Sequence, residues 1–246
     1  MDRQRLSSIA HSHHPIAAPI SGVNVNRLLR RAGRGPAARI LDLGCGEAAW
    51  AMQALAHYPD GVADGIDLSP YALERAAEAA AVRGLTERLT LHERDASGYV
   101  PDGDYDLVMC VGMTHVFGGL GETIASAGRH VRPDGVLLVG ELFWASSPTP
   151  DLTTFFGELT DLAGLADAAE GSGWTPIYVH VSDQAEWDTY EWSWVGSLTE
   201  WALDNPGHPD AADALDEARS HREQWLRGYR GIAGFATMVL RRVEKV

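Results

Sequence analysis

The chain has 246 residues, an ordinary hydrophobic share of 45% and a formal net charge of −14 at pH 7. This length suits one domain over residues 1–246, and the strong negative charge argues against DNA or RNA as a partner. No apolar run approaches the roughly 20 residues that a membrane-spanning helix needs, so no membrane partner is expected.

Residues 1–32 are expected to form an N-terminal arm. The first stretch lacks the apolar core of a signal peptide and holds three histidines, His11, His13 and His14, between two prolines. No carboxylate or thiol lies close to them in the sequence, so we favour an arm that folds over a ligand and expect no metal. Val23–Ala32 has the apolar and basic spacing of a helix leading into the domain.

The stretch Arg39–Ala48, RILDLGCGEA, organises the rest of the chain. An apolar run that ends in Gly44-Cys45-Gly46 and restarts with helical spacing predicts a buried strand, a tight turn and a helix N-terminus. Glycines leave the backbone open to a ligand, and a helix N-terminus attracts electron-rich groups. We therefore expect the first strand and cofactor turn of a nucleoside-binding α/β domain.

Helices and strands are predicted to alternate from this turn to residue 140. The pattern predicts helices over 48–57, 71–83 and 124–131, and strands over 62–68, 89–95, 105–111 and 136–140. Ser69 and Pro70 suit the N-cap and first position of the second of these helices. Alternation at this spacing implies a parallel sheet with right-handed crossovers.

The C-terminal part has a different pattern. We expect a helix over 151–169, a strand over 175–181, an aromatic-rich helix over 184–204, a long helix over 209–229 and a closing strand over 235–242. Insertions at about 145–172 and 183–232 are expected to form a helical cap. Two cysteines, Cys45 and Cys110, give no disulfide framework, which favours a cytoplasmic protein. The sequence does not indicate an oligomeric state.

An acidic residue, Asp67, ends the second predicted strand. A glycine turn followed by such an acid fits two cofactor classes, because in both the acid can bind ribose hydroxyls. The spacing alone fits NAD and S-adenosylmethionine equally, and it also fits an ordinary loop between a strand and a helix.

An ordered set of motifs between residues 39 and 141 narrows this choice. Asp42 stands two residues before the first glycine, where NAD-binding folds usually carry an apolar residue. The set resembles the five motifs of class I S-adenosylmethionine-dependent methyltransferases: Asp42-Leu43-Gly44-Cys45-Gly46, Gly65-Ile66-Asp67-Leu68-Ser69, Arg94-Asp95-Ala96, Tyr105-Asp106-Leu107-Val108 and Arg132-Pro133-Asp134-Gly135-Val136-Leu137. The family's third glycine is Ala48 here, and we expect the turn to close normally.

The resemblance implies S-adenosyl-L-methionine as cofactor and S-adenosyl-L-homocysteine as product. It implies a Rossmann-like, seven-stranded α/β sheet of order 3-2-1-4-5-7-6, with the last strand antiparallel, helices on both faces and a helical cap. The implied cofactor positions are Gly44, Cys45 and Gly46 at the methionine part, Asp42 at the loop or the cofactor amine, Asp67 and Leu68 at the ribose, Asp95 and Ala96 at the adenine, and Cys110 and Val111 at the sulfonium end.

A narrower resemblance is carried by Cys110–His115 with Gly118 and Gly119, by Gly140–Trp144, and by residues between Asp183 and Glu191. These blocks look like a bacterial subgroup of small-molecule methyltransferases, which implies a small-molecule acceptor. Methyl transfer from a sulfonium is an in-line displacement, so the protein mainly aligns the nucleophile and excludes water.

Three residues after predicted strands are candidates for acceptor chemistry. His115 is the candidate catalytic base if the acceptor must lose a proton, although a structural histidine bonded to a loop carbonyl fits equally well. Glu141 and Trp144 follow the predicted strand over 136–140 at the ligand edge and are candidate acceptor-binding residues. Glu141 could bind a cationic or hydroxylated acceptor, or cap a loop.

Trp187 and Tyr190, with Trp194, are candidate walls of an acceptor pocket under the cap. Packing within the cap explains most of its aromatic residues equally well. An aromatic, acidic setting suits an apolar or cationic acceptor, because ring faces attract cations.

The favoured function is therefore methyl transfer from S-adenosylmethionine to a small molecule. The alternatives are an NAD(P)-dependent oxidoreductase, a non-catalytic cofactor-binding protein on the same fold, and a methyltransferase that acts on a protein.

Overall fold

Helices and strands alternate through most of the chain in the computed structural model, which describes residues 1–100 and 103–243. The strands are β1 (Arg39–Leu43), β2 (Val62–Asp67), β3 (Leu89–Glu93), β4 (Tyr105–Val111), β5 (Val131–Trp144), β6 (Trp174–Val181) and β7 (Ala233–Arg242). The helices are α1 (Arg3–Ala10), α2 (Gly22–Ala32), α3 (Ala49–His57), α4 (Pro70–Val82), α5 (Thr114–Phe117), α6 (Leu120–Gly128), α7 (Pro150–Phe156), α8 (Leu162–Gly171), α9 (Gln184–Asp204) and α10 (Ala211–Gln224). Two short turns are η1 (Ala96–Gly98), a 3-10 turn, and η2 (Trp225–Tyr229), a π-helical turn.

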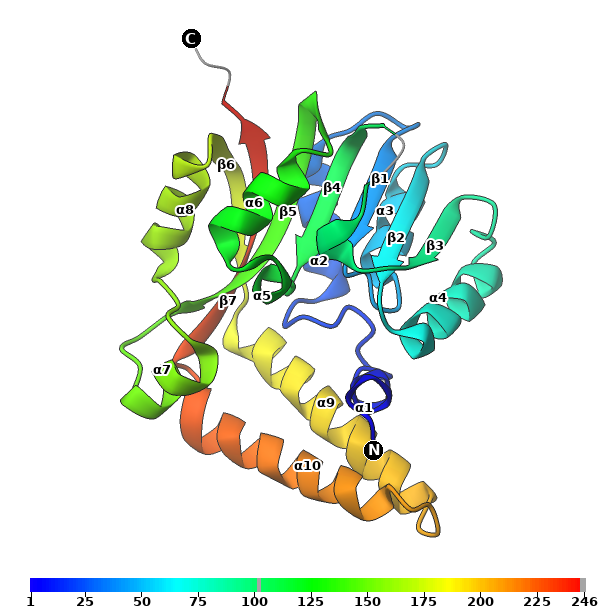
Figure 1. Cartoon of the computed structure of the whole chain (residues 1–246), viewed down its shortest axis with the longest axis vertical. Helices are drawn as coiled ribbons and strands as arrows, with labels where there is room; N and C mark the ends of the chain where they lie inside the picture. Colours follow the sequence, from blue (N-terminus) through cyan, green and yellow to red (C-terminus); the bar gives the residue numbers. More distant parts are fainter. Residues whose placement is uncertain (101–102, 244–246) are drawn as a thin grey trace.

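The seven strands form one mixed sheet in the order β3-β2-β1-β4-β5-β7-β6. The pairs β3–β2, β2–β1, β1–β4 and β4–β5 are parallel, while β7 runs antiparallel to both β5 and β6. The carboxyl ends of the parallel strands face α9 and α10 in Figure 1. The predicted Rossmann-like fold, its strand order and its antiparallel last strand are confirmed.

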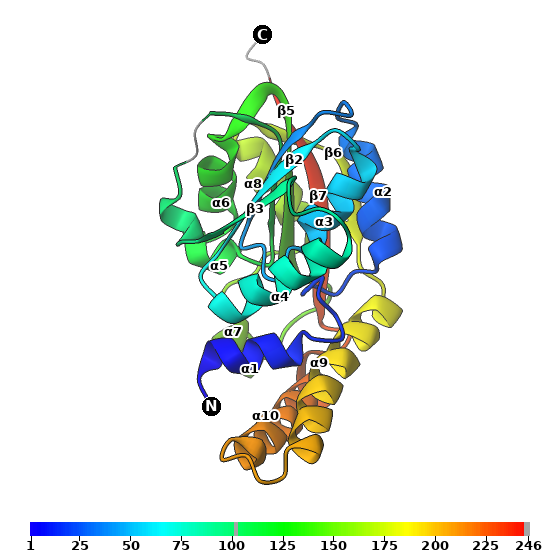
Figure 2. The same cartoon turned by 90° about the vertical axis from the view of Figure 1, so that its right-hand side faces the viewer.

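Alternating side chains of the central strand β4 divide the core into two layers. Leu107 and Met109 pack with α2, α3 and α4, whereas Val108 and Cys110 pack with α6 and α8. Figure 2 shows these helix layers on opposite faces of the sheet. All four side chains are fully buried, so β4 is packed on both faces. This packing fixes the position of its carboxyl end.

A third buried cluster joins the N-terminal helix to the hairpin formed by α9 and α10. Ala10 of α1 packs with Val195 of α9 and Ala214 of α10. A capping box starts α9, in which the Asp183 carboxylate accepts from the Glu186 backbone N–H. The hairpin lies beyond the carboxyl ends of the parallel strands in Figure 1, so α1, α9 and α10 form a layer at the ligand edge. Within the described residues, no helix combines the length and the hydropathy needed to cross a membrane.

Several connecting segments differ from the sequence-based expectations. The helix expected over 151–169 is broken into α7 and α8, because the chain turns at Gly157 with φ 80° and restarts at Asp161, whose carboxylate caps α8. The helix expected over 209–229 leaves α-helical geometry after Gln224 and continues as η2. The expected N-terminal arm contains the helix α1, where Asp2 caps the first turn by accepting from the Arg5 N–H. The strand expected over 136–140 is longer, from Val131 to Trp144.

Candidate active site

The glycine turn after β1 is held by backbone hydrogen bonds to the neighbouring strand. The N–H groups of Gly44 and Cys45 both donate to the Ile66 carbonyl, at 2.8 and 2.9 Å. Gly44 has φ 74°, and a Cβ there would lie 2.3 Å from Cγ of Met113. Gly46 has φ 53°, but a Cβ there would meet nothing within 4 Å. Packing therefore requires glycine at the first position, whereas the second faces open space that a ligand can occupy.

Asp67 ties the end of β2 to this turn. Its Oδ2 accepts from the Gly46 N–H at 2.8 Å, and its Oδ1 accepts from the Ser69 N–H at 2.8 Å. The side chain is half-buried, while the next residue, Leu68, is 56% exposed. Each carboxylate oxygen keeps a second lone pair, so Asp67 can still accept from a sugar hydroxyl.

Asp42 lies beneath the turn and is nearly sealed from solvent, with 3% of its surface exposed. Its carboxylate accepts a hydrogen bond from the Ala51 backbone, but its Oδ2 has no partner among the described residues. Burial, together with the charge of nearby Asp67, raises the pKa of Asp42 to about 7. A buried carboxylate oxygen without a partner fits a site that receives an ammonium group or a water bound to one.

The ends of β3 and β4 complete this edge. Asp95 caps η1, accepting from the Ser97 N–H at 2.9 Å and the Ser97 hydroxyl at 2.8 Å, and these bonds lower the pKa of Asp95. Ala96 is buried beside it. Cys110 is fully buried and Val111 is half-buried, and burial raises the pKa of the Cys110 thiol. The chain thus brings the predicted cofactor residues of β1 to β4 to one edge of the sheet.

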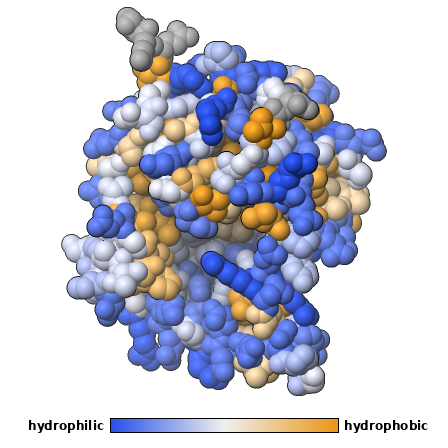
Figure 3. All heavy atoms as spheres, in the orientation of Figure 1, coloured by the Kyte–Doolittle hydropathy of each residue, from blue (hydrophilic) through white to orange (hydrophobic). Residues whose placement is uncertain are grey.

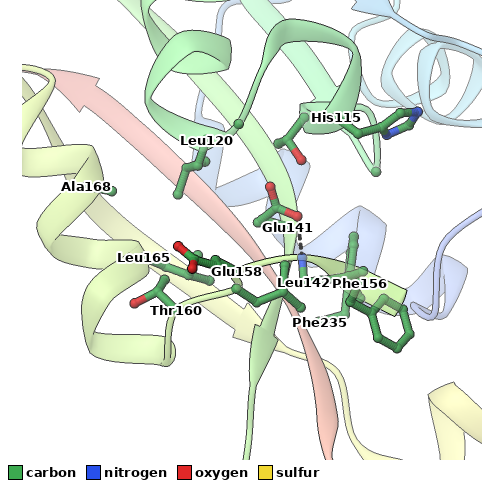
Figure 4. A pocket seen from close by; sticks show the side chains of 14 residues that line it. His115, Leu120, Glu141, Leu142, Phe156, Glu158, Thr160, Leu165, Ala168 and Phe235 are labelled. Atoms are coloured by element: carbon green, nitrogen blue, oxygen red, sulfur yellow. Dashed lines mark hydrogen bonds between the residues drawn. The ribbon is translucent and has the colours of Figure 1, made fainter. Parts of the chain in front are cut away.

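A cavity of about 340 Å³ opens at the carboxyl ends of β4 and β5. Figure 3 shows the surface hollowed between the body of the sheet and the lower helices, with hydrophobic residues on the rim. Figure 4 shows the cavity lining from close by. The lining residues are Gly112, Thr114, His115, Gly119, Leu120, Glu141, Leu142, Phe156, Glu158, Leu159, Thr160, Leu165, Ala168 and Phe235.

Two of the predicted acceptor residues, His115 and Glu141, line this cavity together. Glu141 accepts from the Leu142 N–H at 2.7 Å and shares a hydrogen bond with the Thr114 side chain. Burial raises the pKa of Glu141 despite these bonds. His115 is exposed, and Figure 4 shows its ring turned away from the Glu141 carboxylate. Glu141 therefore faces the interior of the cavity, and His115 stands at its rim.

The predicted aromatic walls lie elsewhere. Trp187 is 8% exposed and meets the Tyr229 ring at 6.2 Å. The Tyr190 hydroxyl lies 3.2 Å from Nε2 of His11, so this ring holds α1 against α9. Trp144, the other candidate acceptor-binding residue, is not among the cavity-lining residues but meets the ring of Phe156, which is, at 5.8 Å.

The three histidines of the N-terminal arm do not converge on one point. The rings of His11 and His14 both contact Tyr190, while His13 faces Glu200 at 3.6 Å. No cluster suited to a metal ion occurs within residues 1–100 and 103–243.

Known proteins support the interpretation that this geometry suggests. Residues 40–135 match the family model described as "Methyltransferase domain". The YjhP protein of Escherichia coli (strain K12), described as uncharacterized, is 29% identical over 250 residues, covering 98% of this chain and 99% of YjhP. The crystal structure of an S-adenosylmethionine-dependent methyltransferase from Geobacter sulfurreducens in complex with S-adenosyl-L-homocysteine has a TM-score of 0.90 at 27% identity, covering 97% of this chain and 98% of that one.

A second such structure, from Thiobacillus denitrificans and also in complex with S-adenosyl-L-homocysteine, has a TM-score of 0.89 at 27% identity, covering 98% of this chain and 100% of that one. This chain belongs to the class I S-adenosylmethionine-dependent methyltransferases. The methyltransferase assignment removes the alternative of an NAD(P)-dependent oxidoreductase.

Sequence reasoning missed several cavity residues of this methyltransferase. Glu158 and Thr160 fall inside the helix expected over 151–169, where a loop was not foreseen. The glycine at position 157, next to the aromatic pair Phe155-Phe156, is the one local signal that could have indicated a break there. Phe235 was predicted only as a strand residue, because its side-chain direction depends on the antiparallel register of β7.

Proposed function

We propose that this methyltransferase transfers the methyl group of S-adenosylmethionine to a small-molecule acceptor bound in the cavity beside β4 and β5. The observation that carries the proposal is that cavity, about 340 Å³ in volume and lined by both apolar and ionisable side chains. Sites for small ligands are concave and measure roughly 300–1,000 Å³. Of a macromolecular acceptor, only a small segment, such as one side chain, would fit into a cavity of this volume.

The glycine turn and the strand-end acids would hold the cofactor. The open space at Gly46 admits the methionine part, and the free oxygen of Asp42 suits its ammonium group. Asp67 would accept hydrogen bonds from the ribose hydroxyls. Asp95 and Ala96 would contact the adenine. When bound, the cofactor supplies an electrophilic methyl group on a positively charged sulfur, and no metal is needed for that chemistry.

The chain's own residues then orient the acceptor and remove a proton where one must leave. Glu141 lies inside the cavity, and burial raises its pKa, which makes its carboxylate a stronger proton acceptor. His115 at the rim can pass that proton to water. The apolar lining limits the access of water to the reacting centre.

Tritiated-methyl S-adenosylmethionine, incubated with the full chain and pools of small metabolites, tests the proposal. We expect label in a low-molecular-weight product. The Gly46→Ala variant is the control, because its side chain would enter the open space that we assign to the cofactor. Label that appears only in a protein fraction would contradict the small-molecule acceptor.

We also propose a cytoplasmic location. Its support is that Cys45 and Cys110 are both buried and free, as in proteins of reducing compartments.

A further inference from the structure

The charged side chains that line the cavity are mainly acidic. Two carboxylates, Glu141 from β5 and Glu158 from the loop after α7, line it together with His115, and none of its lining residues is an arginine or a lysine. Figure 4 shows both glutamates among the cavity-lining side chains, Glu141 on the strand and Glu158 on the loop. The cavity therefore favours positive charge, and the net charge of −14 on the chain adds to that preference.

Glu141 is held in place but lacks a counter-charge. Its hydrogen bonds come from Thr114 and the Leu142 N–H, which are neutral groups. The ion pairs found among the described residues do not include it. A half-buried carboxylate without a cation is unfavourable in the empty protein, and a cationic ligand would relieve that cost.

Glu158 lies on a loop whose backbone is held by hydrogen bonds on its C-terminal side. The Trp144 N–H donates to the Thr160 carbonyl at 2.8 Å, which attaches the loop to the end of β5. Asp161 accepts from the Gly164 N–H at 2.8 Å and so fixes the start of α8. These two anchors keep the second carboxylate beside the cavity.

The remaining wall is apolar and partly aromatic. Two phenylalanines from different elements, Phe156 of α7 and Phe235 of β7, contribute rings, and leucines fill much of the rest. Ring faces attract ammonium groups, and the leucines suit a hydrocarbon body. A carboxylate or phosphate acceptor would meet repulsion from both glutamates.

We infer that the acceptor is a small primary or secondary amine with an apolar body, bound as its ammonium form between Glu141 and Glu158. This inference rests on the proposed function and names the acceptor class for the same site. Glu158 serves as the anchor for the cation, and Glu141 as the group that takes its proton. A neutral alcohol would leave both carboxylates without a counter-charge.

The reaction balances with these groups alone. The ammonium nitrogen first gives a proton to the Glu141 carboxylate and regains its lone pair. That lone pair forms the new N–C bond while the C–S bond of the donor breaks and its electron pair stays on sulfur. The products are an N-methylammonium ion and S-adenosyl-L-homocysteine, and Glu141 then releases its proton to water through the cavity mouth. The raised pKa of Glu141 suits it to receive a proton.

A metabolite extract separated by ion exchange into cationic, neutral and anionic pools gives the test. Each pool is incubated with the full chain and tritiated-methyl S-adenosylmethionine. We expect label in the cationic pool, and Glu158→Gln should lower that labelling about tenfold at limiting acceptor, as for the loss of one charge-assisted hydrogen bond. Glu170→Gln is the matched control, because Glu170 is an exposed residue of α8 outside the cavity lining, and should leave labelling unchanged.

The outcomes separate this inference from the proposed function. Label confined to the neutral or anionic pool would overturn the amine acceptor and leave small-molecule methylation standing. No label in any pool, from protein shown by calorimetry to bind S-adenosyl-L-homocysteine, would overturn the proposed function and the inference with it. A loss of labelling in Glu158→Gln counts only if that variant still binds S-adenosyl-L-homocysteine with the parent affinity; an equal loss in Glu170→Gln would contradict the role of Glu158.

Discussion

Arg75 and Glu47 join the glycine turn to the N-terminal helix. Nε of Arg75 lies 3.1 Å from Oε1 of Glu47, the residue that follows Gly46, and Nη1 of the same guanidinium donates to the Ser8 carbonyl of α1 at 2.9 Å. One side chain of α4 thus contacts both the turn and the helix that lies over this edge of the sheet. The glycine turn and α1 should therefore respond together to a change at Arg75.

The substitution Arg75→Ala tests this connection. It removes the ion pair and the bond to Ser8, so we expect faster hydrogen exchange in α1 and a stability loss of about 1 kcal/mol. Hydrogen exchange followed by mass spectrometry measures the first effect, and urea unfolding the second. Arg83→Ala, at the exposed end of the same helix, is the control. Unchanged exchange in α1 would show that Arg75 does not hold it.

The two glycines of the turn should respond differently to alanine. Gly44→Ala should destabilise the fold by roughly 2 kcal/mol, because the new methyl group overlaps Met113 and φ is positive. Gly46→Ala should cost about 1 kcal/mol, since only the backbone conformation is strained, yet it should lose most affinity for S-adenosyl-L-homocysteine.

Thermal unfolding and calorimetry with S-adenosyl-L-homocysteine separate these two effects. Adding Met113→Ala to Gly44→Ala should recover part of the lost stability, because it removes the overlapping side chain. Full affinity in Gly46→Ala would remove the support for the cofactor at that position.

Ala48 adopts a left-handed backbone conformation, with φ 55° and ψ 28°, at the start of α3. The turn closes there at a cost of roughly 1 kcal/mol for a residue with a Cβ. Ala48→Gly should therefore raise the free energy of unfolding by up to about 1 kcal/mol. The gain is reduced by the larger conformational entropy that glycine has in the unfolded chain. Urea unfolding measures the change, and Ala49→Gly inside α3 should instead destabilise.

The buried Asp42 gives stability a defined pH dependence. Its pKa is raised from 3.8 to about 7 in the folded protein, so the folded chain binds a proton that the unfolded chain releases. The free energy of unfolding should therefore fall as the pH rises from about 4 to 7. Asp42→Asn should flatten this fall by an amount on the order of 2 kcal/mol, measured by urea unfolding across that range. A weaker fall should remain in the variant, because burial also raises the pKa of Glu47 to about 7.

The same carboxyl group predicts a proton signature of cofactor binding. An ammonium group beside the free oxygen of Asp42 would favour its ionised form, so S-adenosyl-L-homocysteine should release a proton on binding near pH 6 to 7. Calorimetry in buffers of different ionisation enthalpy measures this release. Asp42→Asn should abolish it and weaken binding about tenfold. An unchanged proton count in Asp42→Asn would contradict the contact.

A buried polar network links the helical hairpin to the cavity. Glu191, 1% exposed, accepts from the Tyr229 hydroxyl at 2.7 Å and lies 2.6 Å from Nε2 of His221. The Tyr229 ring meets Phe156 of the cavity wall at 5.2 Å. Glu191→Ala should cost roughly 3 kcal/mol of stability, because it leaves buried partners unpaired.

Tyr229→Phe provides the finer test of this network. It keeps the ring against Phe156 and removes one hydrogen bond, so we expect a loss of about 1 kcal/mol in thermal unfolding and little change in KM once an acceptor is known. A large rise in KM for Tyr229→Phe would mean that the hydroxyl itself acts in the cavity.

The parts that the sequence predicts well are those set by local backbone chemistry. The glycine turn needs glycine at position 44, and Asp67 ends a strand that must face that turn, so both are visible in the motif. Glu141 could be placed at the ligand edge because the register of a parallel strand fixes where it ends. The resemblance to methyltransferases then supplied the strand order.

The parts that sequence reasoning missed depend on contacts between distant segments. Trp187 and Tyr190 were predicted as cavity walls, but the rotation of α9 is set by its packing with α1 and α10, which one sequence does not encode locally. The loop position of Glu158 was not predicted, because the alanine- and leucine-rich sequence around 151–169 favours a helix. In the structure, the single glycine Gly157, with positive φ, breaks that helix. Cavity-lining residues that depend on packing between distant segments are therefore the hardest to predict from the sequence pattern.

The antiparallel strand β7 has a consequence for how this architecture can vary. Since β6 ends at the ligand edge and β7 starts there, any segment spliced between them leaves from that edge and must return to it. Lengthening, shortening or replacing α9 and α10 would therefore remodel the helical layer at this edge without changing any strand pairing of the sheet. Related chains can therefore differ in this hairpin while the sheet and the glycine turn stay the same.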